Sequence, residues 1–262
     1  MCQEAIIIGA GIGGLACAAA MAQSGISVRL YEQATALGEV GAGLQISPNG
    51  LAVLRALGIS DMLYDSGAVQ AQTVLLADYK HGAQVARLDL RLLDDQRYLF
   101  MHRADLIDVL AHAAREAGVQ MTFGARVQAI KDRTVYFHDG KQDQSDVIVG
   151  ADGLRSVVRE ALNGADDPFF TGQVAWRALV ETPAGMEAPT ATVTMGPGRH
   201  IVSYPIRGGA LTNIVAVQER GTWAAEGWAH ADDPRNLRDA FSMFSGPARE
   251  LIERVEDVNI WG

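Results

Sequence analysis

The chain has 262 residues, of which 48% are hydrophobic and 20% are charged, a composition typical of a folded globular protein and not of a disordered or fibrous one. The formal net charge of −9 argues against binding to nucleic acid or to an anionic membrane surface. The two cysteines, Cys2 and Cys17, fit no metal-ligand spacing, so we expect no metal site.

The N-terminal residues predict a β-α-β unit. The β-branched run Ala5–Ile8 is typical of a buried parallel strand, a helix follows up to Gly25, and Val28–Tyr31 forms the next strand. The stretch Ala5–Ser27 carries no charge and is long enough to cross a membrane, but its five glycines favour a strand, a turn and a helix. No basic segment precedes it, as a signal peptide would require, so we expect a cytoplasmic protein without a membrane partner.

Helices and strands alternate through the middle of the chain. Apolar residues at helical spacing, each run followed by a glycine, predict helices at Pro48–Leu57 and Arg103–Ala117. The segment Thr73–Leu90 is mixed and reads as β structure, and a short helix is expected at Ser156–Leu162. Three further strands are expected, the last an apolar run typical of a strand buried on both faces: 119–123, 135–137 and 147–149.

Alternating segments and turns dominate beyond Gly164. They predict the antiparallel strands 174–180, 190–195, 200–206 and 211–217, the last two joined by a hairpin at Gly208-Gly209, and a polar helix at Pro234–Phe244. The pattern therefore predicts two domains. Residues 1–72 and 91–165 form a nucleotide-binding α/β domain, and residues 73–90 and 166–262 form a β domain.

The segment from Gly9 to Gly14 matches the pattern G-x-G-x-x-G between the first strand and the first helix. Gly9 permits the tight turn, Gly11 lets the backbone approach a diphosphate, and Gly14 lets the helix pack close to the strand. Glu32, eighteen residues after Gly14, is placed to accept hydrogen bonds from ribose hydroxyls and to repel a 2′-phosphate. These residues predict a dinucleotide other than NADP and leave FAD and NAD open.

The chain resembles the single-component flavoprotein aromatic hydroxylases, particularly the salicylate and 3-hydroxybenzoate hydroxylase group. The matching segments are Gly9–Gly14 with Glu32, 39–49, His102–Leu106, Gly150–Gly153 with Ser156 and Arg159, and Gly198–Pro205. The resemblance implies a Rossmann-like FAD-binding domain of the p-hydroxybenzoate hydroxylase type with an antiparallel β substrate domain. It also implies FAD as cofactor and NADH or NADPH as a transient electron donor, which explains the absence of a second G-x-G-x-x-G from the sequence.

The resemblance also implies cofactor contacts outside the glycine turn. Arg103 begins a helix, where it opposes the helix dipole, so pairing with the FAD phosphates explains it better than local stability does. A solvated surface arginine remains the alternative. Asp152 follows a strand and precedes a helix, at the edge of the sheet where ligands bind. The remaining positions with implied contacts are Gln33, Val40, Val127 (through its backbone), Gly153 and Arg159, and Gln45 lies in the loop that lines the flavin in relatives.

The implied reaction is NAD(P)H-dependent hydroxylation of a phenolic or aromatic-acid substrate with O2, through a flavin C4a-hydroperoxide. A phenol reacts faster as it loses its proton, and histidine suits the role of general base. His200 and Tyr204 are four residues apart in a predicted strand, so both face one side together with Val202. We expect His200 to act as base and Tyr204 as its partner, a purely structural His-Tyr pair being the alternative. Arg177 matches a family position beside the flavin ring, where a cation stabilises reduced flavin.

The family's third motif, Gly-Asp followed by Ala-Ala-His-Pro, has no counterpart up to Gly262. We therefore expect a fold that lacks the C-terminal strand and helix, poor FAD retention, weak or absent turnover, and a homodimer formed through the bare sheet edge. Two alternatives to the monooxygenase remain open. One is an FAD-dependent dehydrogenase, and the other is a non-catalytic FAD-binding remnant.

Overall fold

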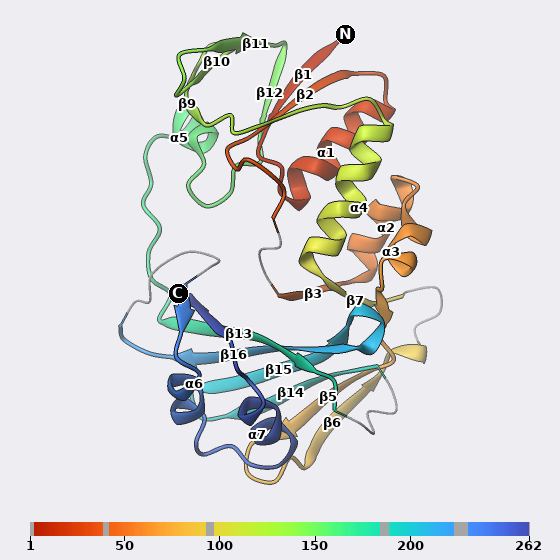
Figure 1. Cartoon of the computed structure of the whole chain (residues 1–262), viewed down its shortest axis with the longest axis vertical. Coiled ribbons are helices and arrows are strands. Elements are labelled where there is room, and N and C mark those ends of the chain that lie inside the picture. The colour runs from red at the N-terminus through yellow and green to blue at the C-terminus, as the bar shows by residue number, and fades with distance from the viewer. Residues whose placement is uncertain (1–2, 39–41, 93–96, 184–188, 223–229, 262) are drawn as a thin grey trace. The chain divides into compact units, whose positions relative to one another are not determined.

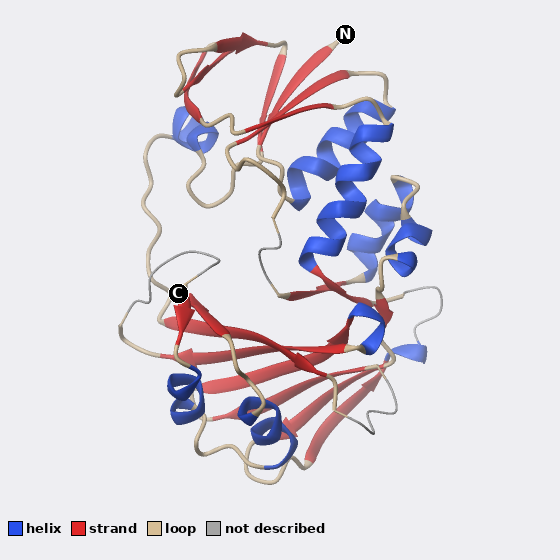
Figure 2. Ribbon diagram, in the orientation of Figure 1, coloured by secondary structure: helices blue, strands red, loops and turns tan. Residues whose placement is uncertain are grey.

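The computed structural model describes residues 3–38, 42–92, 97–183, 189–222 and 230–261. The chain divides into two compact units that interleave along the sequence (Figures 1 and 2). Unit 1 comprises residues 1–39, 53–62 and 104–169, and unit 2 comprises residues 40–52, 63–103 and 170–262. The expected α/β class is confirmed, because unit 1 contains a parallel sheet with helices and unit 2 contains a mostly antiparallel sheet.

The central sheet of unit 1 has four parallel strands in the order β12-β1-β2-β8. The strands are β1 (Glu4–Ile8), β2 (Ser27–Glu32), β8 (Gln120–Phe123) and β12 (Val147–Gly150). Helix α1 (Ile12–Gln23) connects β1 to β2 and packs against both strands, which confirms the predicted β-α-β unit. None of the described helices is long and apolar enough to span a membrane.

The other helices of this part of the chain are short, except for the predicted helix that begins at Arg103. They are α2 (Pro48–Ala56), α3 (Ser60–Asp65), α4 (Arg103–Glu116) and α5 (Val157–Asn163). Helix α4 buries Leu106, Ile107 and Leu110, as the helical spacing of its apolar residues predicted. The sequence did not predict α3.

The strand β12 is not buried on both faces, and that expectation was wrong. It lies at an edge of the parallel sheet, where it pairs with β1 alone among the described strands. Val147 is accordingly 36% exposed. No residue of β12 is fully buried, so its two faces are only partly covered. An apolar run reports the strand itself but not how much of its surface other elements cover.

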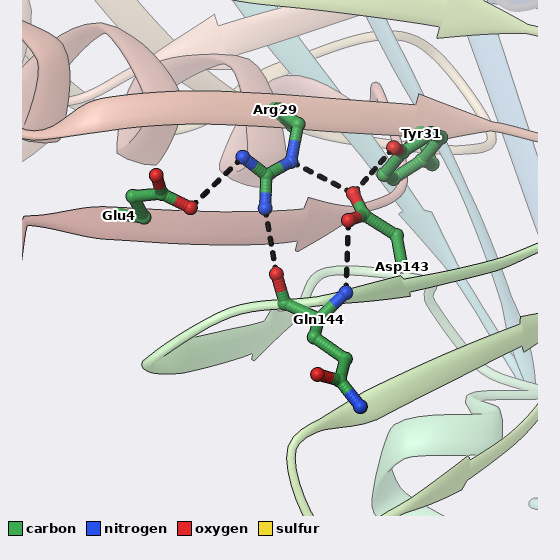
Figure 3. Close-up of polar contacts among 5 residues, drawn as sticks. All are labelled: Glu4, Arg29, Tyr31, Asp143 and Gln144. Carbon is green, nitrogen blue, oxygen red and sulfur yellow. Dashed lines mark hydrogen bonds and ion pairs between the residues drawn. The ribbon is translucent and has the colours of Figure 1, made fainter.

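A small antiparallel sheet of β9 (Val127–Lys131), β10 (Thr134–Phe137) and β11 (Gln142–Gln144) completes unit 1. Polar contacts join it to the parallel sheet (Figure 3). Arg29 on β2 donates from Nε to Asp143 Oδ2 at 2.7 Å and from Nη2 to the carbonyl oxygen of Gln144 at 2.7 Å. The Tyr31 hydroxyl donates to the same Asp143 oxygen at 2.7 Å. These bonds hold β11 against β2.

We expect Tyr31→Phe to remove a component of the alkaline unfolding of unit 1. Burial, followed by the hydrogen bond to Asp143, raises the pKa of Tyr31 to about 12, above its ordinary value of 10.0. The neutral phenol therefore contributes stability that is complete below pH 10 and is lost as the pH rises toward 12. Urea unfolding followed by circular dichroism at a series of pH values across this window should show a steeper loss of unfolding free energy for the wild type than for Tyr31→Phe.

The matched control is Tyr136→Phe, because Tyr136 lies on β10 of the same unit and is 37% exposed. This variant should retain the alkaline slope of the wild type. At neutral pH, Tyr31→Phe should cost about 0.5–1.5 kcal/mol, the net value of one hydrogen bond. Parallel slopes for Tyr31→Phe and the wild type would contradict the assignment.

Unit 2 is built on an eight-stranded sheet in the order β17-β18-β13-β16-β15-β14-β5-β6. All neighbouring pairs are antiparallel except β14 and β5, which run parallel. The strands are β5 (Thr73–Asp78), β6 (Gln84–Asp89), β13 (Gln173–Glu181), β14 (Thr190–Gly196), β15 (Arg199–Ile206), β16 (Leu211–Glu219), β17 (Ala231–Asp232) and β18 (Val258–Trp261). The predicted hairpin is confirmed, with the 3₁₀ turn η2 (Arg207–Gly209) joining β15 to β16.

Helices α6 (Pro234–Ala240) and α7 (Gly246–Glu253) cover one face of this sheet (Figure 1). Trp176, Ile201 and Ile214 point from the strands into the core beneath them, together with Phe241. The predicted helix at 234–244 is shorter than expected, because it ends at Ala240 and the chain turns before α7, which the sequence did not predict.

The opposite face of the sheet carries a second core, in which Tyr204 packs with Phe100. Phe100 belongs to a small sheet of β3 (Gly43–Ile46), β7 (Leu99–His102) and β4 (Val69–Gln70), and η1 (Leu90–Leu92) follows β6. Residues 40–52, 63–72 and 91–103, expected in the nucleotide-binding domain, thus belong to the compact unit of the antiparallel sheet. The functional boundaries between an FAD-binding and a substrate domain remain predictions.

Candidate functional site

The glycine turn after β1 has the geometry that its sequence pattern predicts. Gly9 has a φ of +102°, and a Cβ atom there would overlap the carbonyl oxygen of Ala151. A Cβ atom on Gly14 would overlap the carbonyl oxygen of Gly9 and lie 3.2 Å from the Cβ atom of Ala151. Glycine is therefore required at both positions by close packing of the turn, the first helix and the residue that follows β12, Ala151.

The N-terminus of α1 is open to an anion. Gly11 is its N-cap residue, no side chain caps it, and no acidic residue lies in its first turn. Cβ atoms placed on Gly11 and Gly13 would meet nothing within 4 Å among the described residues. Free N–H groups and the positive end of a helix dipole are the features that bind a diphosphate, so the residues here fit an FAD diphosphate.

Glu32 ends β2 beside this turn. Its carboxylate accepts hydrogen bonds from the backbone N–H groups of Ala10, at 2.7 Å, and Ala34, at 2.8 Å. One residue of the glycine turn is thereby tied to the second strand. Each carboxylate oxygen can accept a further hydrogen bond, so the expected contact with a ribose stays compatible with this geometry.

The side chain of Asp152 accepts hydrogen bonds at the N-terminus of α5 in this structure. Its Oδ2 atom accepts from the N–H of Val157 at 2.7 Å, and its Oδ1 atom accepts from the hydroxyl of Ser156. Arg159 turns back and donates from Nη1 to the carbonyl oxygen of Gly153 at 3.4 Å. The three predicted positions therefore form one local cluster after β12. Their roles toward FAD or a nicotinamide stay predictions.

The remaining positions expected in unit 1 differ in exposure. Val127 begins β9 and its side chain is 8% exposed in a core with Val135 and Phe137, which leaves only its backbone for the expected adenine contact. Gln33 is exposed directly after β2. Val40 lies outside the described residues. The expected cofactor contacts of all three stay predictions.

Unit 2 brings two predicted arginines into electrostatic range of each other. Burial lowers the pKa of Arg177, Tyr204 raises it, and the charge of Arg103 lowers it further. Burial also lowers the pKa of Arg103. The guanidinium of Arg177 stacks over the ring of Trp261, with 4.5 Å between the guanidinium carbon and the ring centroid. Two partly desolvated cations near one another favour binding of an anionic group.

The sheet register places all three expected catalytic side chains on one face. His200, Val202 and Tyr204 alternate along β15, as predicted from their spacing. Val202 pairs with Val215 on β16, and Val215 pairs with Arg177 on β13. Arg177 therefore shares the face of His200 and Tyr204, which is the face opposite α6 and α7.

Tyr204 is nearly inaccessible, with 3% of its surface exposed, and its ring centroid lies 5.0 Å from that of Phe100. Burial raises its pKa well above the ordinary value, and the charge of Arg177 opposes that shift in part. The phenol is therefore neutral over the physiological range. It can donate a hydrogen bond on this face but cannot serve as an anionic base.

Two polar residues of this region, Tyr98 and Asn213, were not predicted from the sequence as part of the site. The hydroxyl of Tyr98 donates to Oε1 of Gln45 at 2.8 Å, which orients the side-chain amide of Gln45. Asn213 is completely buried, and its Oδ1 atom accepts from the N–H of Gly43 at 2.7 Å. The only sequence signal for Asn213 is a polar residue within an apolar strand, which identifies no partner.

Comparison with known proteins assigns the chain to a family of FAD-binding domains. The model of the FAD-binding-domain family matches residues 3–214 of this chain. The 3-amino-4-hydroxybenzoate 2-monooxygenase PtnB3 of Streptomyces platensis is 33% identical over 97% of the chain, and the 3-hydroxybenzoate 6-hydroxylase of Polaromonas naphthalenivorans is 33% identical over 98% of it. The chain spans 66% of the length of each of these two relatives.

A solved structure shows the same architecture. HpxO of Klebsiella pneumoniae, complexed with FAD and uric acid, superposes with a TM-score of 0.84 at 27% sequence identity. The match covers 98% of this chain and 67% of that one. The similarity therefore extends over both units and is not limited to the glycine turn.

Proposed function

Because the chain belongs to the FAD-binding-domain family, we propose that it is part of an FAD-dependent monooxygenase that hydroxylates a phenolic or aromatic-acid substrate. The observation that carries the proposal is the combination of two sites. Unit 1 contains an open helix N-terminus with Glu32 at the end of the adjoining strand. Unit 2 contains a sheet face with His200, Tyr204 and Arg177.

In this proposal the glycine turn from Gly9 to Gly14 and Arg103 bind the FAD diphosphate, and Glu32 binds the ribose. Further contacts come from Gln33, Val40, Val127, Asp152, Gly153 and Arg159. When bound and reduced by NADH or NADPH, FAD would activate O2, of which one oxygen atom enters the ring and the other leaves as water. A cytoplasmic location and a homodimer are further parts of the proposal.

The substrate chemistry depends on the face of the antiparallel sheet. His200 accepts the proton of the substrate hydroxyl, which raises the electron density of the aromatic ring. Tyr204, a neutral phenol, donates a hydrogen bond to the same oxygen as negative charge develops on it. Arg177 supplies a fixed positive charge for the anionic form of the reduced cofactor or for an acid group of the substrate. Tyr204 is 3% exposed, so little of this side chain is in contact with water.

The test begins with the purified chain titrated with FAD, because the sequence predicts weak retention. At saturating FAD, oxidation of NADH and of NADPH is followed with a panel of hydroxybenzoates and hydroxynicotinates, together with O2 uptake. Incorporation of isotopically labelled oxygen from O2 into the product is the expected result, at the low rate that the sequence predicts for this chain.

Each alternative has its own outcome in this experiment. Substrate oxidation without O2 uptake would replace the proposal with an FAD-dependent dehydrogenase. FAD binding without any substrate-dependent NAD(P)H oxidation would favour the non-catalytic FAD-binding remnant. Failure to bind FAD at any concentration would exclude the monooxygenase, the dehydrogenase and the FAD-binding remnant alike.

A further inference from the structure

Asn213 occupies a completely buried position on the sheet face proposed to bind the substrate. It is the cross-strand partner of Tyr204 on one side and of Leu179 on the other. Residues opposite each other in neighbouring strands point to the same face, so the amide of Asn213 lies beside the ring of Tyr204.

The amide oxygen of Asn213 holds a distant segment of the chain. It accepts the hydrogen bond of the Gly43 N–H at 2.7 Å, across 170 residues of sequence. A Cβ atom on Gly43 would lie 2.8 Å from Cε2 of Tyr204 and 2.9 Å from Cβ of Asn213. The backbone of β3 therefore packs directly on these two side chains, without room for any other residue at position 43.

The strand held in this way carries Gln45 and contacts the start of α4, where Arg103 lies. Gly43 pairs with His102 on β7, and the N–H of Arg103 donates to the carbonyl oxygen of Ala42 at 3.2 Å. Gln45, with its amide oriented by Tyr98, lies two residues beyond Gly43. A displacement of Gly43 would therefore move both Gln45 and the start of α4.

Stability alone does not account for an asparagine here. Its Nδ2 atom is buried and has no hydrogen-bond partner among the described residues. A buried amide donor without a partner costs free energy, which the single bond to Gly43 offsets only in part. Thr212, the preceding residue, is equally buried but faces the other way, and its hydroxyl lies 3.0 Å from that of Thr182.

We propose that Asn213 is a positioning residue that holds the 43–46 strand, and with it Gln45, against the Tyr204 face of the sheet, so that the flavin ring and the aromatic substrate meet a fixed wall. The orientation of this strand toward the flavin rests on the proposed function and on the expected place of Gln45 beside the flavin, whereas its attachment to the sheet does not. Asn213 acts on the ligands through Gly43, Gln45 and Arg103, and the bond to Gly43 is the one it contributes.

The first measurement uses the chain without FAD. Hydrogen exchange of a peptide that covers residues 42–46 should become about fivefold faster in Asn213→Ala, the factor that corresponds to one net hydrogen bond. Asn213→Asp retains an oxygen for the Gly43 N–H and should slow this exchange relative to Asn213→Ala, even though burial of a carboxyl group lowers the overall stability. Thr212→Val removes a buried hydroxyl contact from the same strand but on the opposite face, and should leave this peptide unchanged.

The second measurement uses FAD. The dissociation constant for FAD and the fluorescence of the bound flavin should change in Asn213→Ala and recover in Asn213→Asp, while Thr212→Val retains wild-type values. If Asn213→Ala does not fold, Asn213→Ser, whose side chain ends one bond sooner and lacks the amide oxygen, is judged by the same criteria.

Unchanged exchange of residues 42–46 in Asn213→Ala would overturn the inference, as would an equal acceleration in Thr212→Val. Faster exchange with unaltered flavin binding and fluorescence would reduce Asn213 to a purely structural role and so overturn it as well. Failure of the wild-type chain to bind FAD would refute the proposed function, while the exchange measurement would still decide whether Asn213 holds the strand.

Discussion

Gly14→Ala should destabilise unit 1 and abolish measurable FAD binding, whereas Gly13→Ala, one residue earlier in the same helix, should do neither. A Cβ atom at position 14 would overlap the carbonyl oxygen of Gly9, so the helix α1 must move away from the turn. At position 13 a Cβ atom would meet nothing within 4 Å among the described residues. The two substitutions add the same methyl group and differ only in what surrounds it.

The expected changes in the free energy of unfolding depend on two opposing effects, the helix propensity of alanine and the steric overlap of its Cβ atom. Alanine in place of glycine favours a helix by about 1 kcal/mol, so Gly13→Ala should be neutral or slightly stabilising. In Gly14→Ala the overlap with backbone atoms outweighs this gain, and overpacking of this kind costs about 1–3 kcal/mol or more. Chemical denaturation measures the first quantity, and titration with FAD followed by flavin fluorescence measures the second.

Gly11→Ala separates folding from binding at the same turn. Its Cβ atom would meet nothing within 4 Å of the described residues, so stability should be retained. FAD affinity should nevertheless fall at least tenfold, because the added atom would stand where the backbone approaches the diphosphate. Wild-type affinity in Gly11→Ala, or wild-type stability in Gly14→Ala, would contradict the roles assigned to these two glycines.

His200→Ala should lower kcat by about two to four orders of magnitude, the usual contribution of a general base, with a much smaller effect on substrate affinity. His200 lies on β15 with its side chain on the same face as Tyr204 and Arg177. Its loss removes the group that accepts the proton of the substrate hydroxyl. Stopped-flow measurement of the hydroxylation step at neutral pH should show this loss directly.

Phenolic substrates that lose their proton without a general base test the role of His200 directly. A phenolic acid with a strongly electron-withdrawing ring substituent is already a phenolate at neutral pH, so His200→Ala should lose much less activity with it. His200→Gln keeps a hydrogen-bonding side chain without a base and should behave as His200→Ala does. Tyr204→Phe keeps the ring contact with Phe100 and removes only the hydroxyl, so it should produce a smaller loss than His200→Ala. Equal losses with ionised and neutral substrates would exclude His200 as the base.

Local features of the chain were predicted well because neighbouring residues create them. The turn between β1 and α1 requires glycine at position 9, where φ is +102°, and this requirement is visible in the spacing of glycines alone. The helix α4, the strand β15 and the hairpin at Gly208-Gly209 likewise follow from hydrophobic period and turn chemistry. These elements place the predicted residues His200 and Tyr204 on one face without knowledge of the rest of the fold.

Features that depend on the order of strands were predicted less well. The run 147–149 has the composition of a strand buried on both faces, yet β12 is an edge strand of the described sheet. Parallel pairing of β14 with β5 joins segments more than 100 residues apart, and no local pattern reports it. Assignment of residues 40–52 to the unit of the antiparallel sheet has the same origin, because β3 pairs with β7 and contacts β16.

The amino-acid order alone was thus enough to establish the dinucleotide turn, the likeness to flavoprotein hydroxylases and the common face of His200 and Tyr204, since each depends on residues close together in the chain or on a motif. The fold was needed to bring Arg177 onto that face through two steps of cross-strand pairing, and to bring Asn213 to Gly43. Contacts of that kind arise when separate segments pack into one core, and the free energy of packing depends on all of those segments together, which no single stretch of sequence contains.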